Sequence, residues 1–368
     1  MPRSDFLIGL TRVFWASAVP LSLSALAPLS VQAASFNRLF VFGDSLSDPG
    51  NTATVTKGLF PPPVLPGVDS ATNKFGFFPA YTQQRFTDNL NWIDYLAPKL
   101  GVTSTTNYAF AGATTGTQNT TLPFLPGLQQ QISTFLFSLT APTPEDLFVV
   151  WAGSNDYLAT ASQTNPNIPV GNLESAVRAL ADAGAQNILV ANLEDLGKTP
   201  LVKSQSNAEQ VSELINQHNT LLTSTLTGLA TDPSFEDASL ISFDVFSLLN
   251  EAISQPEKFG FTNVSDPCLA NLALSSLLTL PILKCANPDQ YLFWDSLHPT
   301  DKAHQILADA AFSTIKASSE ASNPIADTSF SILQTSYSVA VPEPVSNTAV
   351  GVLGSSLVLT RLLLKKVA

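Results

Sequence analysis

Three residues that together could carry out acyl transfer lie in two distant parts of the sequence. Ser45 stands in FVFGDSLSDPGN (residues 40–51), where an apolar run ends in glycine and turn-forming residues follow. Asp295 and His298 stand in YLFWDSLHPTDKAH (residues 291–304). Acyl transfer near neutral pH needs an activated hydroxyl, a base within hydrogen-bond reach and a group that orients the base. The chain contains 3 histidines, so the choice of base is narrow.

The spacing of the late pair suits a base and its orienting group. Residues i and i+3 lie on one face of a turn, so Asp295 can hold the imidazole of His298 in one tautomer. Two other acids, Asp289 and Asp301, are alternative orienters. Ser45 also has an alternative role, because serine favours the cap position at the start of a helix.

Short apolar runs alternate with amphipathic stretches along the chain. They predict strands within residues 38–43, 106–116, 145–157, 186–197 and 238–249, and helices within residues 89–101, 171–185, 207–230 and 300–315. This alternation predicts an α/β fold with a mainly parallel five-stranded sheet covered on both faces. His218 and His304 fall in predicted helices, where we expect them to be surface or packing residues.

Small or polar residues follow the first three predicted strands. Ser45 follows the first strand, Gly112 lies in the turn after the second, and Asn155 follows the third. Functional residues of open parallel sheets gather at the carboxyl ends of the strands. We therefore expect these three residues to approach one another, although Asn155 could instead organise a turn.

Several ordered segments resemble the blocks of one enzyme family. FVFGDSLSDPGN resembles the first block of the GDSL, or SGNH, family of serine esterases and lipases, and RFTDNLNWIDYLA resembles the segment that follows in its lipase and acyltransferase branch. NYAFAGATTG, VVWAGSNDY and FWDSLHPTDKAH are similar to the glycine, G-x-N-D and D-x-x-H blocks. The resemblance spans residues 36–315 and implies a three-layer α/β/α sandwich of the flavodoxin-like type.

The resemblance also implies a role for each motif residue. Ser45 would be the nucleophile, His298 the base and Asp295 its orienter. The oxyanion hole would consist of the backbone N–H groups of Ser45 and Gly112 and the side-chain amide of Asn155. A helical turn opening at Ser45 would add its dipole, and glycine at 112 would let a backbone donor approach the substrate closely. No cofactor and no metal are expected.

The function implied is that of an exported serine esterase or lipase acting on acyl lipids or small esters. Apolar contacts for the substrate are expected from the insertion that contains Phe60, Phe75, Phe77 and Phe78 and from the loop between the two cysteines. One alternative is a carbohydrate O-deacetylase of the same fold with a more polar cleft. Another is a non-catalytic surface adhesin on a hydrolase scaffold.

Both ends of the chain resemble targeting signals that flank a hydrolase domain at residues 35–316. Residues 1–34 predict a signal peptide cut by signal peptidase near Ala33 or Ala34, with a buried N-terminal helix as the alternative. Residues 317–344 predict a linker. Residues 345–368 follow VPEP, are largely apolar and end in basic residues, so they resemble a PEP-CTERM sorting tail that a membrane protease removes. A permanent transmembrane anchor is the alternative.

Cysteine usage and charge fit an exported protein. Cys268 and Cys285 are the 2 cysteines of the chain, and one pair in an exported chain predicts a disulfide, with buried free thiols as the alternative. The net charge of −12 argues against nucleic acid as a partner, because phosphate binding requires a basic surface. The expected location is the periplasm, the cell surface or the medium.

Overall fold

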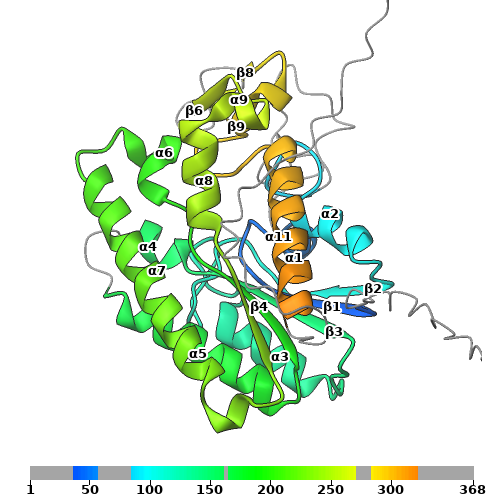
Figure 1. Ribbon diagram of the computed structural model, residues 1–368. Helices are drawn as coiled ribbons and strands as arrows, with labels where there is room; N and C mark the ends of the chain where they lie inside the picture. Colours follow the sequence, from blue (N-terminus) through cyan, green and yellow to red (C-terminus); the bar gives the residue numbers. More distant parts are fainter. Residues whose placement is uncertain (1–35, 57–83, 161–164, 271–282, 322–368) are drawn as a thin grey trace, which may run out of the picture.

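The computed structural model describes residues 36–56, 84–160, 165–270 and 283–321 (Figure 1). The predicted signal peptide, the C-terminal segment 345–368, and the four phenylalanines of the predicted substrate contact lie outside these residues. The last helix continues to Ala321, so the first five residues of the predicted linker are helical. Within the described ranges, no helix combines the length and the apolar character needed to cross a membrane.

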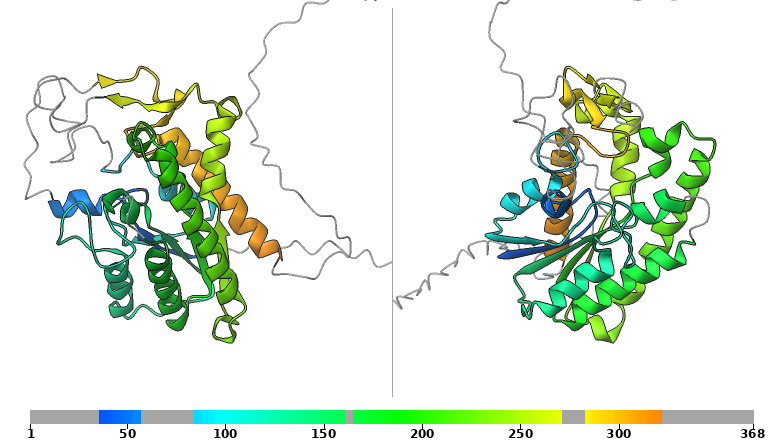
Figure 2. Two further views of the ribbon diagram at one scale, coloured as in Figure 1. Left: turned by 90° about the vertical axis from the view of Figure 1, so that its left-hand side faces the viewer. Right: turned by 180° about the vertical axis from the view of Figure 1, so that it is seen from behind.

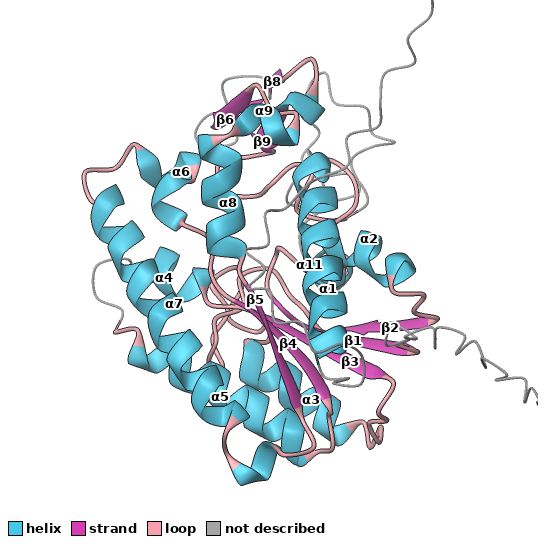
Figure 3. Cartoon of the chain, in the orientation of Figure 1, coloured by secondary structure: helices cyan, strands magenta, loops and turns pink. Residues whose placement is uncertain are grey.

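A five-stranded parallel sheet forms the centre of the protein, as predicted (Figure 3). Its strand order is β2-β1-β3-β4-β5, so the order reverses beside β1. Such a reversal is the place where an open α/β sheet opens a crevice at the carboxyl ends of its strands. The strands are β1 (Arg38–Gly43), β2 (Ser104–Asn107), β3 (Asp146–Trp151), β4 (Asn187–Ala191) and β5 (Ser239–Phe243).

Helices cover both faces of the sheet, which explains why the central strands are continuous apolar runs (Figures 1 and 2). Helices α2 and α11 pack on one face, while α3 and α5 pack on the other. The helices are α1 (Asn51–Thr56), α2 (Trp92–Lys99), α3 (Leu128–Phe137), α4 (Ser154–Thr160), α5 (Asn167–Asp182), α6 (Pro200–Lys203), α7 (Ala208–Ala230), α8 (Val245–Ser254), α9 (Pro256–Phe259) and α11 (Asp301–Ala321). Short 3₁₀ helices occupy Leu196–Lys198, Pro233–Phe235 and Pro288–Gln290.

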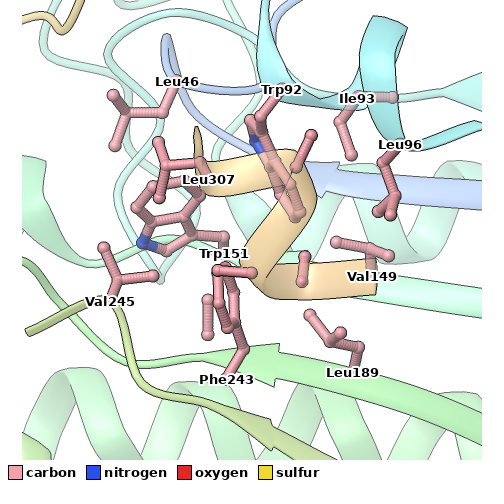
Figure 4. Packing of buried hydrophobic residues seen from close by; sticks show 14 of the residues in the cluster. Leu46, Trp92, Ile93, Leu96, Val149, Trp151, Leu189, Phe243, Val245 and Leu307 are labelled. Carbon is pink, nitrogen blue, oxygen red and sulfur yellow. The ribbon is translucent and has the colours of Figure 1, made fainter. Parts of the chain in front are cut away.

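The central strands β1, β3 and β4 each contribute to two separate hydrophobic cores because their side chains alternate between the faces. Val41 and Val149 belong to the core beneath α2 and α11, whereas Phe40 and Phe148 belong to the core beneath α3 and α5. Trp151 lies at the end of β3 in the first core, among Leu46, Val245 and Leu307 (Figure 4). This core therefore extends from the sheet to the carboxyl ends of β1 and β3.

Two small two-stranded sheets gather with α9 at one end of the molecule (Figure 1). Strand β6 (Asn263–Pro267) pairs with β9 (Tyr291–Phe293), and β7 (Leu269–Ala270) pairs with β8 (Leu283–Lys284). Cys268 and Cys285 form the predicted disulfide beside the second pair. The disulfide thus joins the two ends of the segment whose middle, residues 271–282, lies outside the described residues.

Candidate active site

The five motif residues converge at the carboxyl ends of the first three strands. Ser45 lies two residues after β1, Gly112 in the turn that follows β2, and Asn155 in the first turn of α4 after β3. Asp295 and His298 lie in the loop between β9 and α11. Although 253 positions separate Ser45 from His298, the two side chains meet at this edge of the sheet.

Ser45, His298 and Asp295 form a continuous hydrogen-bonded row. The Nε2 atom of His298 lies 2.8 Å from Ser45 Oγ, and its Nδ1 atom lies 2.8 Å from Asp295 Oδ2. Asp295 is 3% exposed, and its Oδ1 atom accepts backbone N–H groups at 297 and 298, each at 2.7 Å. These bonds fix the carboxylate, so it can hold the imidazole with Nε2 directed at the serine hydroxyl.

The loop that carries Asp295 and His298 is closed by backbone hydrogen bonds between its own two ends and is supported from outside by a neighbouring hairpin. The Trp294 N–H donates to His298 O at 2.8 Å, and the Thr300 N–H donates to Leu292 O at 3.0 Å. The hairpin beside the disulfide supports the same loop, because the Leu269 N–H donates to Trp294 O at 2.7 Å. Backbone pairing on both sides therefore limits how far the imidazole can move.

Ser45 lies in a single turn of residues 44–47 rather than at the start of a helix, which differs from the prediction. Helix α1 begins six residues later, and the carboxylate of Asp48 accepts the N–H groups of its first two residues, Asn51 and Thr52, and of the preceding Gly50. Asp48 therefore takes the capping role that was the alternative for Ser45. The hydroxyl of Ser45 is left to His298.

Two backbone N–H groups at the site have no acceptor in the part of the chain that the structure describes: those of Ser45 and Gly112. Gly112 has φ +78°, and a Cβ there would lie 2.3 Å from Thr121 Oγ1. Glycine is thus required both for the left-handed backbone and for the space. This conformation leaves the N–H group available to a substrate oxygen.

The side-chain amide of Asn155 is already engaged. Its Nδ2 atom donates to Asp44 Oδ2 and to Ala113 O, both at 3.2 Å, and its Oδ1 atom accepts from Thr120 Oγ1 at 3.3 Å. These are long hydrogen bonds, and a developing oxyanion would be a stronger acceptor than either partner. The contacts orient the amide without preventing it from donating to a substrate.

Two further acids shape the electrostatics of the site: Asp44 and Glu194. Burial raises the pKa of Asp44 to about 7, and the charge of Glu194 acts in the same direction. Burial also raises the pKa of Glu194, whose Oε1 atom accepts from Ser154 Oγ at 2.8 Å. Each carboxylate makes ionisation of the other less favourable.

The same acids act on the proposed base. Burial disfavours the charged form of His298, but the charge and hydrogen bond of Asp295, together with the charges of Asp44 and Glu194, outweigh it and raise its pKa above 6.5. A more basic imidazole accepts the serine proton more readily, provided that the pH is high enough to keep the ring neutral.

The alternative orienters lie elsewhere. Asp289 is exposed, and Asp301 accepts from Tyr95 Oη at 2.5 Å and from the Leu90 N–H. His218 and His304 are both buried packing residues, so the surface alternative for them is wrong. The described residues contain no group of three or more His, Cys, Asp or Glu side chains that could hold a metal ion.

Glu194 was missed by the analysis of the sequence. It follows β4 in NLEDLG, and the position of a polar residue just after a predicted strand was the available signal. The pattern was not sufficient because Asn192, Glu194 and Asp195 all follow the same strand. Only the packing distinguishes Glu194 from the other two residues, because its side chain lines the same pocket as Ser45 and His298.

Comparison with known proteins identifies the family. Residues 39–311 match the family model described as GDSL-like Lipase/Acylhydrolase. The chain belongs to this family. The GDSL chain is therefore a carboxylic ester hydrolase of the esterase/lipase type, and this part of the prediction is confirmed.

Among characterised relatives, the GDSL chain is 26% identical over 345 residues to a phosphatidylcholine-sterol acyltransferase of Aeromonas hydrophila, covering 81% of this chain and 97% of the relative. It is 26% identical over 326 residues to a GDSL esterase/lipase of Arabidopsis thaliana, covering 74% and 81%. The solved structure of a carbohydrate acetylesterase from Sinorhizobium meliloti aligns with a TM-score of 0.43 at 14% identity, covering 76% of this chain and 99% of that one.

Proposed function

We propose that the GDSL chain is an exported serine esterase that forms an acyl-enzyme at Ser45. The observation that carries this proposal is the row in which His298 Nε2 lies 2.8 Å from Ser45 Oγ while Nδ1 lies 2.8 Å from Asp295 Oδ2. A base that contacts both the hydroxyl and an orienting carboxylate is the arrangement that activates a serine nucleophile.

The reaction proceeds in two acyl-transfer steps. In the first, Ser45 Oγ attacks the carbonyl carbon of the ester and its proton passes to His298 Nε2. The imidazolium then donates this proton to the departing alkoxide, which leaves as the alcohol. In the second, water attacks the acyl-serine with His298 again as the base, which releases the carboxylic acid and restores Ser45.

The negative charge of each tetrahedral intermediate is stabilised by three donors. These are the N–H groups of Ser45 and Gly112 and the side-chain amide of Asn155. The two backbone groups are preorganised and have no protein acceptor within the described ranges, so they need no rearrangement before they bind the oxyanion. Loss of one such donor typically costs about 3 kcal/mol of transition-state stabilisation.

The experiment that tests the nucleophile compares two neighbouring serines. Ser45→Ala should lose at least about a thousandfold in kcat on p-nitrophenyl acetate and lose labelling by a fluorophosphonate probe, with its melting temperature preserved. Ser47→Ala is the control, because Ser47 is buried and its Oγ atom accepts from Trp92 Nε1 at 3.1 Å. That variant should lose stability but remain labelled. Absence of label on folded wild-type protein would refute the proposal and favour a non-catalytic adhesin.

We further propose that residues 1–34 are a signal peptide, residues 35–321 the hydrolase domain with the whole of α11, residues 322–344 a linker, and residues 345–368 a PEP-CTERM-like tail. Support comes from the apolar stretches at both ends and from the VPEP sequence before the second. Intact mass measurement of protein recovered from the envelope and the medium tests both processing steps. A mature protein that begins at Met1 would exclude signal peptidase, and one that retains Ala368 would exclude the sorting protease.

A further inference from the structure

A second pocket lies directly beside the one that contains Ser45. The serine pocket is lined by Ser45, His298 and their neighbours, and it shares Leu46, Glu194 and Leu297 with the second pocket. The second pocket has a cavity volume of about 60 Å³. Because the same three side chains border both spaces, the second pocket adjoins the place that the reacting carbon would take at Ser45 Oγ.

The lining of this second pocket is almost entirely hydrocarbon. Its walls come from the end of β3, from α8 and from α11. Figure 4 shows three of the residues, Leu46, Val245 and Leu307, around the indole of Trp151. Leu248 and Ala252 of α8 and Ala303 of α11 complete the side farther along these helices. Apolar cavities of this kind favour alkyl groups over water.

Two atoms of the lining indicate a place for a ligand rather than packed core. In the described part of the chain, Trp151 Nε1 and Glu194 Oε2 are buried without a hydrogen-bond partner. A buried polar atom left unpaired is costly, so such atoms usually mark a missing water or ligand. Glu194 stands at the border between the two pockets, where a water that enters with the ester can donate a hydrogen bond to its free oxygen.

We propose that this second pocket binds the acyl chain of the substrate and that Ala252 and Leu248 set the longest chain accepted. The inference rests on the proposed function, because it places the carbonyl carbon at Ser45. It assigns the acyl chain to a space between α8 and α11, whereas the sequence predicted contacts from the phenylalanine-rich insertion, which lies outside the described residues. A space that holds one water needs about 10–15 Å³, so this cavity holds about four to six methylene-sized groups.

A series of straight-chain p-nitrophenyl esters tests the proposal on the wild-type protein. Each methylene buried in an apolar site raises kcat/KM about threefold to fourfold, so the value should increase from acetate to hexanoate. It should level off or fall between octanoate and dodecanoate. A wild-type protein that prefers acetate to hexanoate would overturn the proposal.

Two variants change the cavity in opposite directions. Ala252→Leu fills it and should lower the hexanoate-to-acetate ratio of kcat/KM at least tenfold. Leu248→Ala enlarges it and should move the optimum to a longer chain. Ile315→Ala is the control, because Ile315 is a buried residue of α11 that does not line the cavity. It should lower the melting temperature and leave the ratio as in the wild type.

The outcomes distinguish this inference from the proposed function. If Ser45 is labelled and acetate is hydrolysed, but neither cavity variant changes the chain-length profile, the cavity assignment is wrong and the serine esterase remains. If Ser45 is not labelled and no ester is hydrolysed, the proposed function fails first. Should Ala252→Leu not fold, Leu248→Ala alone decides, because an unchanged optimum in that variant contradicts the assignment.

Discussion

The side-chain amide of Asn155 donates to the carboxylate of Asp44 at 3.2 Å, which connects the residue before the proposed nucleophile to a proposed oxyanion donor. Asp44 is 2% exposed, and burial together with the charge of Glu194 raises its pKa to about 7. Near neutral pH, Asp44 therefore gains or loses its proton beside the imidazole of His298. Its charge in the ionised form helps to raise the pKa of that imidazole.

Asp44→Asn should move the acidic limb of the kcat/KM profile to lower pH. His298 must be neutral to accept the serine proton, so activity rises as the pH passes its pKa. Removing the Asp44 charge lowers that pKa and keeps the base active in more acidic solution. The measurement is kcat/KM on a soluble ester between pH 5 and 9. Asp266→Asn is the control, because it changes an exposed carboxylate paired with Lys203, and it should leave the acidic limb in place. An acidic limb that does not move in Asp44→Asn would contradict the effect of the Asp44 charge on the pKa of His298.

Asp295→Asn should lower kcat by about 10³- to 10⁴-fold while the fold is kept. An asparagine retains the shape but cannot hold the Nδ1–H tautomer or stabilise the imidazolium, and this loss is typical of triads. Asp289→Asn is the matched control, because Asp289 is an exposed acid six residues earlier in the chain. Equal activity of the two variants would mean that His298 is oriented by another group. Circular dichroism and the melting temperature check that both variants are folded.

The strand ends could be predicted from the sequence because their signals are local. Each apolar run that ends before a glycine or a polar turn carries its own pattern, and four of the five predicted strands coincide with strands of the sheet. The second, predicted within residues 106–116, overlaps β2 only at positions 106 and 107, because the residues that follow form a loop. The pairing of Asp295 with His298 is also local, since three positions separate them. The contact between Ser45 and His298 could be predicted only from the order of the family blocks, because no local sequence pattern links two positions that are 253 residues apart.

Features that depend on packing between distant elements were not predictable. The apolar cavity is formed where α8 and α11 meet the end of β3, and Glu194 joins it only because β4 ends beside them. The capping role given as the alternative for Ser45 belongs to Asp48, which accepts N–H groups in the first turn of α1. Only the backbone path shows which polar residue of this segment caps the helix.

Removal of the disulfide should affect both stability and catalysis. Replacing Cys268 and Cys285 by alanine opens a link that spans 17 positions, which should lower the free energy of unfolding by about 3 kcal/mol. The kcat should also fall, because the Cys268 N–H donates to Phe293 O at 3.0 Å in the strand that leads to Asp295. Urea denaturation and ester kinetics measure the two effects. An unchanged kcat in a destabilised variant would show that the hairpin does not position the loop.

The pH dependence of stability should reveal the buried neutral state of His304. Burial lowers its pKa to about 3, and its Nδ1 atom accepts the Trp92 N–H at 3.3 Å. In the unfolded chain the imidazole has a pKa near 6.5, so between these values the unfolded state binds the additional proton. Stability is therefore lost as the pH falls below about 6.5, at about 1.4 kcal/mol for each pH unit.

His304→Asn isolates this contribution, since an amide oxygen can replace Nδ1 as the acceptor but does not titrate. Asp44 and Glu194, whose raised pKa values favour the folded state in acid, are present in both proteins and cancel in the comparison. Between pH 7 and pH 5 the wild type should lose about 2 kcal/mol more than the variant in urea denaturation. Parallel curves would mean that His304 titrates alike in the folded and unfolded states, which its burial and its bond to a backbone donor oppose.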